Sequence, residues 1–240
     1  MPSNLAGDIN LGQFNACVVR VARLDSDCSP TGGNNSGWVS AGLVTMTATP
    51  DIEEGTVFEP KTACGDIAYT FEDADRIKRY NLTGEFIFFD WEGMEIMFGG
   101  STIVAAAGPS YAGEVIGYAV PSFTATPNNG VYLEVITKGV AQGAGDCIAT
   151  GTGFPTFYGH IFGKVKLVPG ERVFENDVAR VTFSGKATSN PSLFNGPWND
   201  YPGVGYIPTS PLVAIGYSAA QYATILANVA PGYDDLPAGS

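Results

Sequence analysis

The sequence of 240 residues contains few of the side chains from which most active sites are built. It holds one histidine, His160, and no Gly-x-Ser-x-Gly motif that would present a nucleophilic serine. A Ser-His-Asp or Cys-His catalytic pair would therefore have to use His160, which lies inside an expected strand. Adjacent carboxylates such as Glu53 and Glu54 fall on loops or helix surfaces rather than across a cleft. We predict that the protein is not an enzyme.

Cysteine is also scarce, and it is badly spaced for metal binding. The four cysteines form no C-x-x-C pair, so we expect no zinc site and no other cofactor. The first residues lack the basic stretch and apolar run of a secretory signal, and no apolar stretch reaches the roughly 20 residues of a membrane helix. We therefore expect folding in a reducing cytoplasm, with free thiols and no membrane partner.

Positive charge is the third shortage. Twelve Lys and Arg oppose 24 Asp and Glu, which gives a formal net charge of −12. This balance argues against a protein that holds nucleic acid by neutralising its phosphates, and against one that binds an anionic membrane surface. It is compatible with DNA that passes by without binding.

The residues that are abundant favour a β protein. With 31 glycines, 16 prolines and 12% aromatic residues, the composition predicts many short strands and turns rather than helices. Alternating apolar and polar residues predict strands at 16–24, 44–49, 67–71, 82–88, 114–123, 131–137, 158–168 and 177–185. Both faces of 131–137 are partly apolar, so this strand is expected to be covered on both sides.

Two stretches have helical patterns. Asp90 stands where a helix N-cap would, Glu92 lies in the first turn, and Gly99-Gly100 ends the pattern. A second short helix is predicted over 218–229, with Ser218 as its N-cap. The apolar stripe of the first helix favours packing on a sheet, but Trp91 and Met94 are also candidates for contact with a neighbouring subunit.

An acidic excursion at 51–62 interrupts the strand pattern. It carries Glu53 and Glu54 together with Val57 and Phe58, and these two apolar side chains have no evident cover within a monomer. Exposed apolar strand residues usually mark an interface. We therefore predict that the chain assembles with copies of itself, with these four residues as inter-subunit contacts.

The chain divides into three parts by composition. Residues 1–15 are predicted to be an N-terminal arm, and residues 16–188 to be the β domain. Residues 189–240 are predicted to be a C-terminal extension with the second short helix. This extension includes a proline-rich stretch, 190–211, that has no periodicity.

The ordered features of the first half resemble the major tail protein of long-tailed bacteriophages, the subunit of the tail tube. The resemblance lies in the strand at 44–49 with its acidic excursion, Cys64-Gly65-Asp66-Ile67, the stretch 73–82, and the helix at 90–98 that closes on Gly99-Gly100. It implies a mainly β fold, an antiparallel β-sandwich or barrel with one flanking short helix and a long hairpin-like loop.

The same resemblance implies a structural role in the virion. Six copies would form a ring, and stacked rings would form a tube through which double-stranded DNA passes. Tape measure, tail terminator and tail-tip proteins are the implied partners. Glu85 and Glu134 are the candidate acids of the tube lumen, because each is expected in a strand whose opposite face is apolar. The alternatives are another virion component, such as a head-tail joining or decoration protein, and a bacterial β-sandwich binding module.

Overall fold

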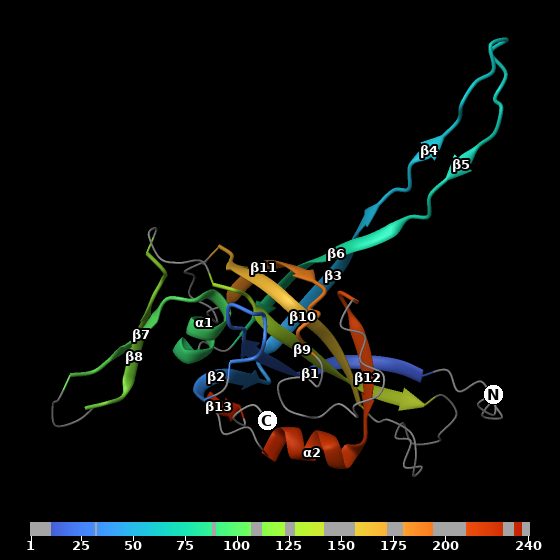
Figure 1. Cartoon of the computed structure of the whole chain (residues 1–240). Coiled ribbons are helices and arrows are strands. Elements are labelled where there is room, and N and C mark those ends of the chain that lie inside the picture. The colour runs from blue at the N-terminus through green and yellow to red at the C-terminus, as the bar shows by residue number, and fades with distance from the viewer. Residues whose placement is uncertain are drawn as a thin grey trace.

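A computed structural model of the chain describes residues 11–31, 33–87, 90–106, 112–122, 128–141, 157–171, 180–193, 210–227 and 233–236. The predicted positions Phe88 and Cys147, most of the N-terminal arm and most of the proline-rich stretch lie outside these residues. The fold is mainly β and antiparallel, as predicted, with two short helices (Figure 1).

The elements are named in chain order. They are β1 (Leu11–Arg23), β2 (Gly33–Ser40), β3 (Leu43–Glu53), β4 (Val57–Phe58), β5 (Phe71–Glu72), β6 (Arg76–Phe86), α1 (Trp91–Phe98), β7 (Ser101–Val104), β8 (Val115–Ala119), β9 (Val131–Ala141), β10 (Phe157–Pro169), β11 (Val181–Thr188), β12 (Val213–Tyr217), α2 (Ala219–Ala227) and β13 (Tyr233–Leu236).

One nine-stranded sheet forms the body. Its order is β13-β2-β1-β9-β10-β11-β6-β3, and β12 adds to β10. The first half of β10 pairs with both β9 and β12, whereas its second half pairs with β11, so the sheet branches at this strand. The sheet also curls, because β3 at one end contacts β1 in the middle. A single curled sheet thus supplies both walls of the core.

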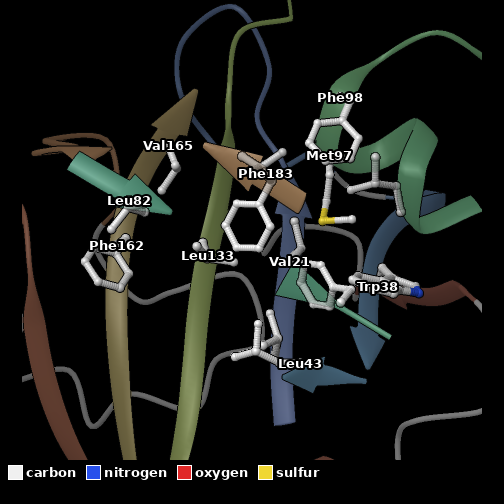
Figure 2. Packing of buried hydrophobic residues seen from close by; sticks show 14 of the residues in the cluster. Val21, Trp38, Leu43, Leu82, Met97, Phe98, Leu133, Phe162, Val165 and Phe183 are labelled. Carbon is white, nitrogen blue, oxygen red and sulfur yellow. The ribbon is translucent and has the colours of Figure 1, made fainter. Parts of the chain in front are cut away.

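The central strands are covered on both faces. In β9, Val131, Leu133 and Val135 point into the main core, whereas Tyr132 and Ile136 join two smaller clusters on the opposite face. Figure 2 shows the main core, in which side chains from β6, β10, β11 and α1 meet those of β1 and β9. The alternation along 131–137 had predicted this double cover, and the prediction is confirmed.

Helix α1 begins and ends where the sequence predicted. The Asp90 carboxylate accepts hydrogen bonds from the backbone N–H groups of Glu92 and Gly93, and its other oxygen accepts one from Nε1 of Trp38 at 2.7 Å. A side chain at Gly93 would collide with the Trp38 ring, so the helix can lie this close to β2 only with glycine there. Gly99 follows the last turn with φ 75°, a conformation that glycine adopts without strain.

Residues 210–227 and 233–236, within the predicted C-terminal extension, pair with the main sheet or pack on it. Ser218 caps α2 by accepting from the backbone N–H of Gln221, while the Gln221 side chain accepts from the backbone N–H of Ser218. Tyr222 of this helix stacks on Phe157 of β10, with ring centroids 3.7 Å apart. Strands β12 and β13 pair with β10 and β2. Likewise, the predicted N-terminal arm gives way to β1 at Leu11, which pairs with Ala141.

A buried ion pair lies on the second face of the central strands. Arg20 of β1 is directly opposite Glu134 of β9, and both side chains are almost fully buried, with Arg20 Nη2 2.6 Å from Glu134 Oε2. Tyr217 of β12 donates its hydroxyl to Glu134 Oε1 at 2.7 Å. A Cβ at Gly159 would lie 2.2 Å from that oxygen, so this glycine makes room for the carboxylate. The prediction that Glu134 lines a lumen is wrong, because the face opposite its apolar neighbours is itself covered.

Glu134→Gln tests the energetic weight of this pair. The substitution leaves the Arg20 charge buried without a carboxylate, which we expect to lower the free energy of unfolding by roughly 3–5 kcal/mol. Urea unfolding of the two proteins measures the difference. Glu85→Gln is the matched control, because it breaks the part-exposed pair with Arg180 and should cost below about 1 kcal/mol. Equal losses from the two variants would contradict a special role for the buried pair.

Candidate assembly interface

The most prominent feature outside the body is a long hairpin, here called the arm and defined as residues 52–78 (Figure 1). Strands β3 and β6 pair from Leu43 opposite Phe86 to Glu53 opposite Arg76. The hairpin continues through β4 and β5 and ends beyond a bridge between Lys61 and Ile67. The sequence had suggested an excursion, a separate strand and a charged link, but these are the two limbs of one hairpin.

Local chemistry keeps the two limbs together. At the tip, the backbone N–H of Gly65 donates to the carbonyl of Thr62 at 2.9 Å, and Gly65 has φ 89°, so the turn favours glycine at this position. Nearer the body, the backbone N–H of Gly55 donates to the Asp75 carboxylate at 2.8 Å. At the root, Arg79 Nε donates to Asp51 Oδ2 at 2.6 Å.

The arm carries apolar side chains that the rest of the chain does not cover. Within 67–71, which the sequence predicts as a strand, Tyr69 and Phe71 are 60% and 57% exposed. Phe58 is 56% exposed, although its ring lies 6.5 Å from that of Tyr69. The other exposed apolar residues of the arm are Ile52, Val57, Ile67 and Ile77. A row of this kind on a projecting hairpin is typical of a surface that meets another molecule.

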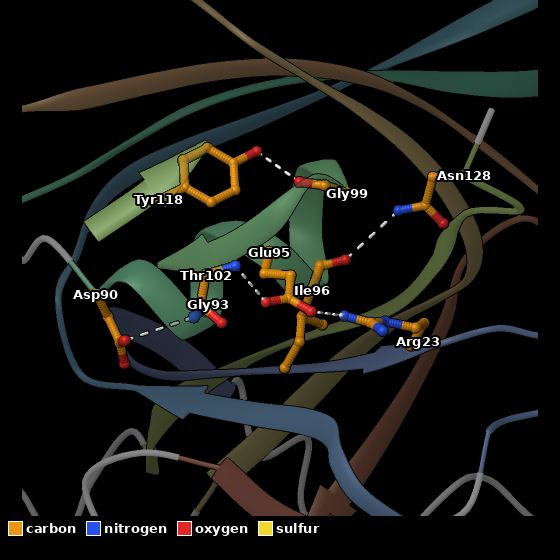
Figure 3. A network of polar contacts seen from close by, with 9 residues as sticks. All are labelled: Arg23, Asp90, Gly93, Glu95, Ile96, Gly99, Thr102, Tyr118 and Asn128. Carbon is orange, nitrogen blue, oxygen red and sulfur yellow. Dashed lines mark hydrogen bonds and ion pairs between the residues drawn. The ribbon is translucent and has the colours of Figure 1, made fainter. Parts of the chain in front are cut away.

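A second hairpin, β7–β8, leaves the body beside α1. Figure 3 shows how it is anchored: Tyr118 donates its hydroxyl to the carbonyl of Gly99, and the backbone N–H of Thr102 donates to Glu95 at 2.8 Å. Its exposed apolar residues are Ile103, Val104 and Ile116, with Val120 just beyond. No strand was predicted from the sequence over 101–104, where the structure has β7. The β-branched run Thr102-Ile103-Val104 was the signal for a strand.

The predicted contact residues have different positions in the structure. Glu53, Glu54, Val57 and Phe58 are all exposed on the arm. Trp91 is partly buried in the first turn of α1. Met94 was also predicted to contact a neighbouring subunit, but it is 2% exposed and packs in the main core, as the apolar stripe of a helix on a sheet does.

The candidate lumen acid Glu85 is only partly free. Its carboxylate accepts from Arg180 Nη1 at 3.0 Å, and its side chain is 20% exposed. The pair neutralises much of its charge locally. Six exposed acids lie instead on the arm: Glu54, Glu59, Asp66, Glu72, Asp73 and Asp75.

His160 lies on β10 with Nε2 3.4 Å from the Thr137 hydroxyl, at a cavity of about 370 Å³ between the central strands and β3. Burial lowers the pKa of its imidazole below the ordinary 6.5, and the Glu134 carboxylate opposes that shift. Among the residues that the structure describes, no group of three or more His, Cys, Asp and Glu side chains is placed to hold a metal ion.

No family model and no curated protein matches the chain. In the part of the chain that the structure describes, neither helix is long and apolar enough to cross a membrane.

The single histidine allows a clean pH experiment. We expect the imidazole of folded protein to titrate below pH 6.5 in proton NMR spectra. The unfolded chain then binds the proton more tightly, so this contribution to stability is present above pH 6.5 and is lost as pH falls toward the folded pKa. His160→Gln removes it. Urea midpoints of the two proteins at several pH values should therefore converge or cross on acidification, and a constant difference would contradict the burial argument.

Proposed function

We propose that the protein is the structural subunit of a phage tail tube, which assembles as hexameric rings that stack into a conduit for DNA. The observation that carries the proposal is the arm. A hairpin with seven half-exposed apolar residues, Ile52, Val57, Phe58, Ile67, Tyr69, Phe71 and Ile77, extends from a double-covered β body. Burying them against another copy would recover hydrophobic free energy that the monomer forgoes.

The rest of the fold supports assembly of this type. Strands β13 and β3 end the strand order of the main sheet, and open edges can pair across subunits. A projecting arm and its receiving surface lie at different places on one chain, so their contact is head-to-tail. Repetition of such a contact gives closed rings or open-ended stacks. Glu53, Glu54, Val57 and Phe58 of the arm, together with the part-buried Trp91, are the proposed contact residues.

The net charge of −12 suits a conduit, because a wall without excess lysine would not retain phosphates by releasing their counterions. Glu85 remains the candidate lumen acid, although its pairing with Arg180 weakens its contribution. The virion tail is the proposed location, and tape measure, tail terminator and tail-tip proteins are the proposed neighbours.

Electron microscopy of the purified chain at high concentration tests the proposal. Stacked tubes support a tail tube subunit. Rings that never stack favour a head-tail joining or decoration protein. A stable monomer that binds glycans favours a bacterial binding module and contradicts the proposal.

The apolar residues of the arm can be tested separately from folding. We expect Val57→Ser with Phe58→Ser to raise the concentration needed for assembly by about tenfold or more, since each exposed side chain buries apolar surface only in the polymer. Thermal unfolding of the monomer should change little. Val44→Ser is the matched control, because Val44 is 47% exposed against 53% for Val57, but lies on the body. Assembly that is unaffected by the arm variant, or equally impaired by the control, would exclude this contact.

Hydrogen exchange examines the same contact in the wild-type protein. Backbone amides of the arm rely on a two-stranded hairpin with no covering layer, so we expect fast exchange in the monomer and strong protection in the assembly. The amides of β9 should be equally protected in both states and serve as the internal control. Equal protection of the arm in monomer and polymer would show that it lies outside the interface.

A further inference from the structure

The outer face of β6, β10 and β11 holds a groove. Its volume is about 660 Å³, and its basic residues are Arg79, Lys164, Lys166 and Lys186. In a chain with 12 Lys and Arg against 24 acids, four cations at one groove are a marked concentration of positive charge.

Two of these cations are held in an unfavourable arrangement. Lys166 and Lys186 are directly opposite each other on neighbouring strands, and like charges in this relation destabilise a sheet. Both residues are exposed, and neither has an ion-pair partner among the described residues. The other two are already engaged, Arg79 by Asp51 and Lys164 by the Cys28 sulfur at 2.8 Å. The lysine pair is therefore the part of the groove that lacks a counter-charge.

We propose that this groove receives the acidic arm of a second copy of the chain. The inference rests on the proposed self-assembly and names the surface that the arm meets. The distal part of the arm, residues 54–75, carries six carboxylates and one cation, and all seven are exposed: Glu54, Glu59, Asp66, Glu72, Asp73, Asp75 and Lys61. The charge of this acidic segment is thus complementary to that of the lysine pair.

The two surfaces also match in their uncharged groups. Val168, which is 58% exposed, lines the groove beside the lysines and gives the apolar side chains of the arm a surface to cover. Ser184 and Thr83 line the same groove, and their hydroxyls can donate to carboxylates. A purely electrostatic site for small anions would not need the exposed valine.

The arm of the same copy cannot fill the groove. Arg79 lies both at the root of the arm and at the rim of the groove, and from there the hairpin extends away from the body (Figure 1). Its limbs are tied to each other by the Lys61–Ile67 bridge and by the bond from Gly55 to Asp75. Bringing the acids of the same copy back to the groove would also require the β3–β6 pairing at the root, which runs from the body to Glu53 opposite Arg76, to break. The acids therefore come from another copy.

Charge reversal of both surfaces tests the inference. We expect Lys166→Glu with Lys186→Glu to raise the concentration needed for assembly by about tenfold or more, because two attractive contacts become repulsive. Glu54→Lys with Glu72→Lys should do the same from the arm. All four substitutions in one chain should restore assembly toward the wild-type concentration. Lys138→Glu is the matched control, since Lys138 is an exposed lysine of β9 outside the groove, and it should leave assembly unchanged.

The other outcomes contradict different parts of the two proposals. Wild-type assembly with an unaffected Lys166/Lys186 variant overturns the groove and leaves the tail tube proposal standing. Loss in both pairs without recovery in the fourfold variant overturns the arm as the occupant. A wild-type chain that never self-associates overturns both proposals. Binding of a short DNA duplex by the monomer that disappears in the Lys166/Lys186 variant would assign the groove to nucleic acid instead.

Discussion

The body of this protein depends on one buried ion pair. Arg20 and Glu134 lie where a β protein normally places apolar side chains, and desolvating two charges costs several kcal/mol unless their hydrogen bonds are satisfied. The fold satisfies them with Tyr217 from β12 and with space provided by Gly159 on β10. The network joins residues 114 and 197 positions apart, so this part of the core is complete only when β12 is in place.

Such a core also determines what is left at the periphery. The apolar residues of β1, β9 and β10 are covered on both faces by the curled sheet and the two helices. No further layer remains for the two hairpins, so the apolar residues of the arm and of β7–β8 face solvent. A monomer gains nothing from these side chains, whereas an assembly can bury them. The same topology thus covers the apolar side chains of the central strands and leaves those of the two hairpins exposed.

Local chemistry made part of this fold predictable. The caps of α1 depend on residues within one turn, so Asp90 and Gly99 could be placed from sequence, and the alternation along β9 predicted its double cover. The residues that pack against a given face of a strand are often distant in the sequence. Glu134 was therefore predicted at a surface because its partner, Arg20, is 114 positions away. Met94 was predicted at an interface although it packs on the sheet, and the lysine pair of the groove depends on the register of β10 with β11.

The distribution of charge connects the fold with the proposed conduit. Glu134 is buried and Glu85 is paired, whereas six exposed acids lie on the arm and a lysine pair without an ion-pair partner among the described residues lies on the body. Left open in a tube, those lysines would hold phosphates and slow the passage of DNA. If the arm of the next copy covers these lysines, each contact takes the lysines and the acids of the arm out of the exposed surface together. The subunit contact and the inert wall would then arise from the same interaction, and the net charge of −12 would be left on the surfaces that remain exposed.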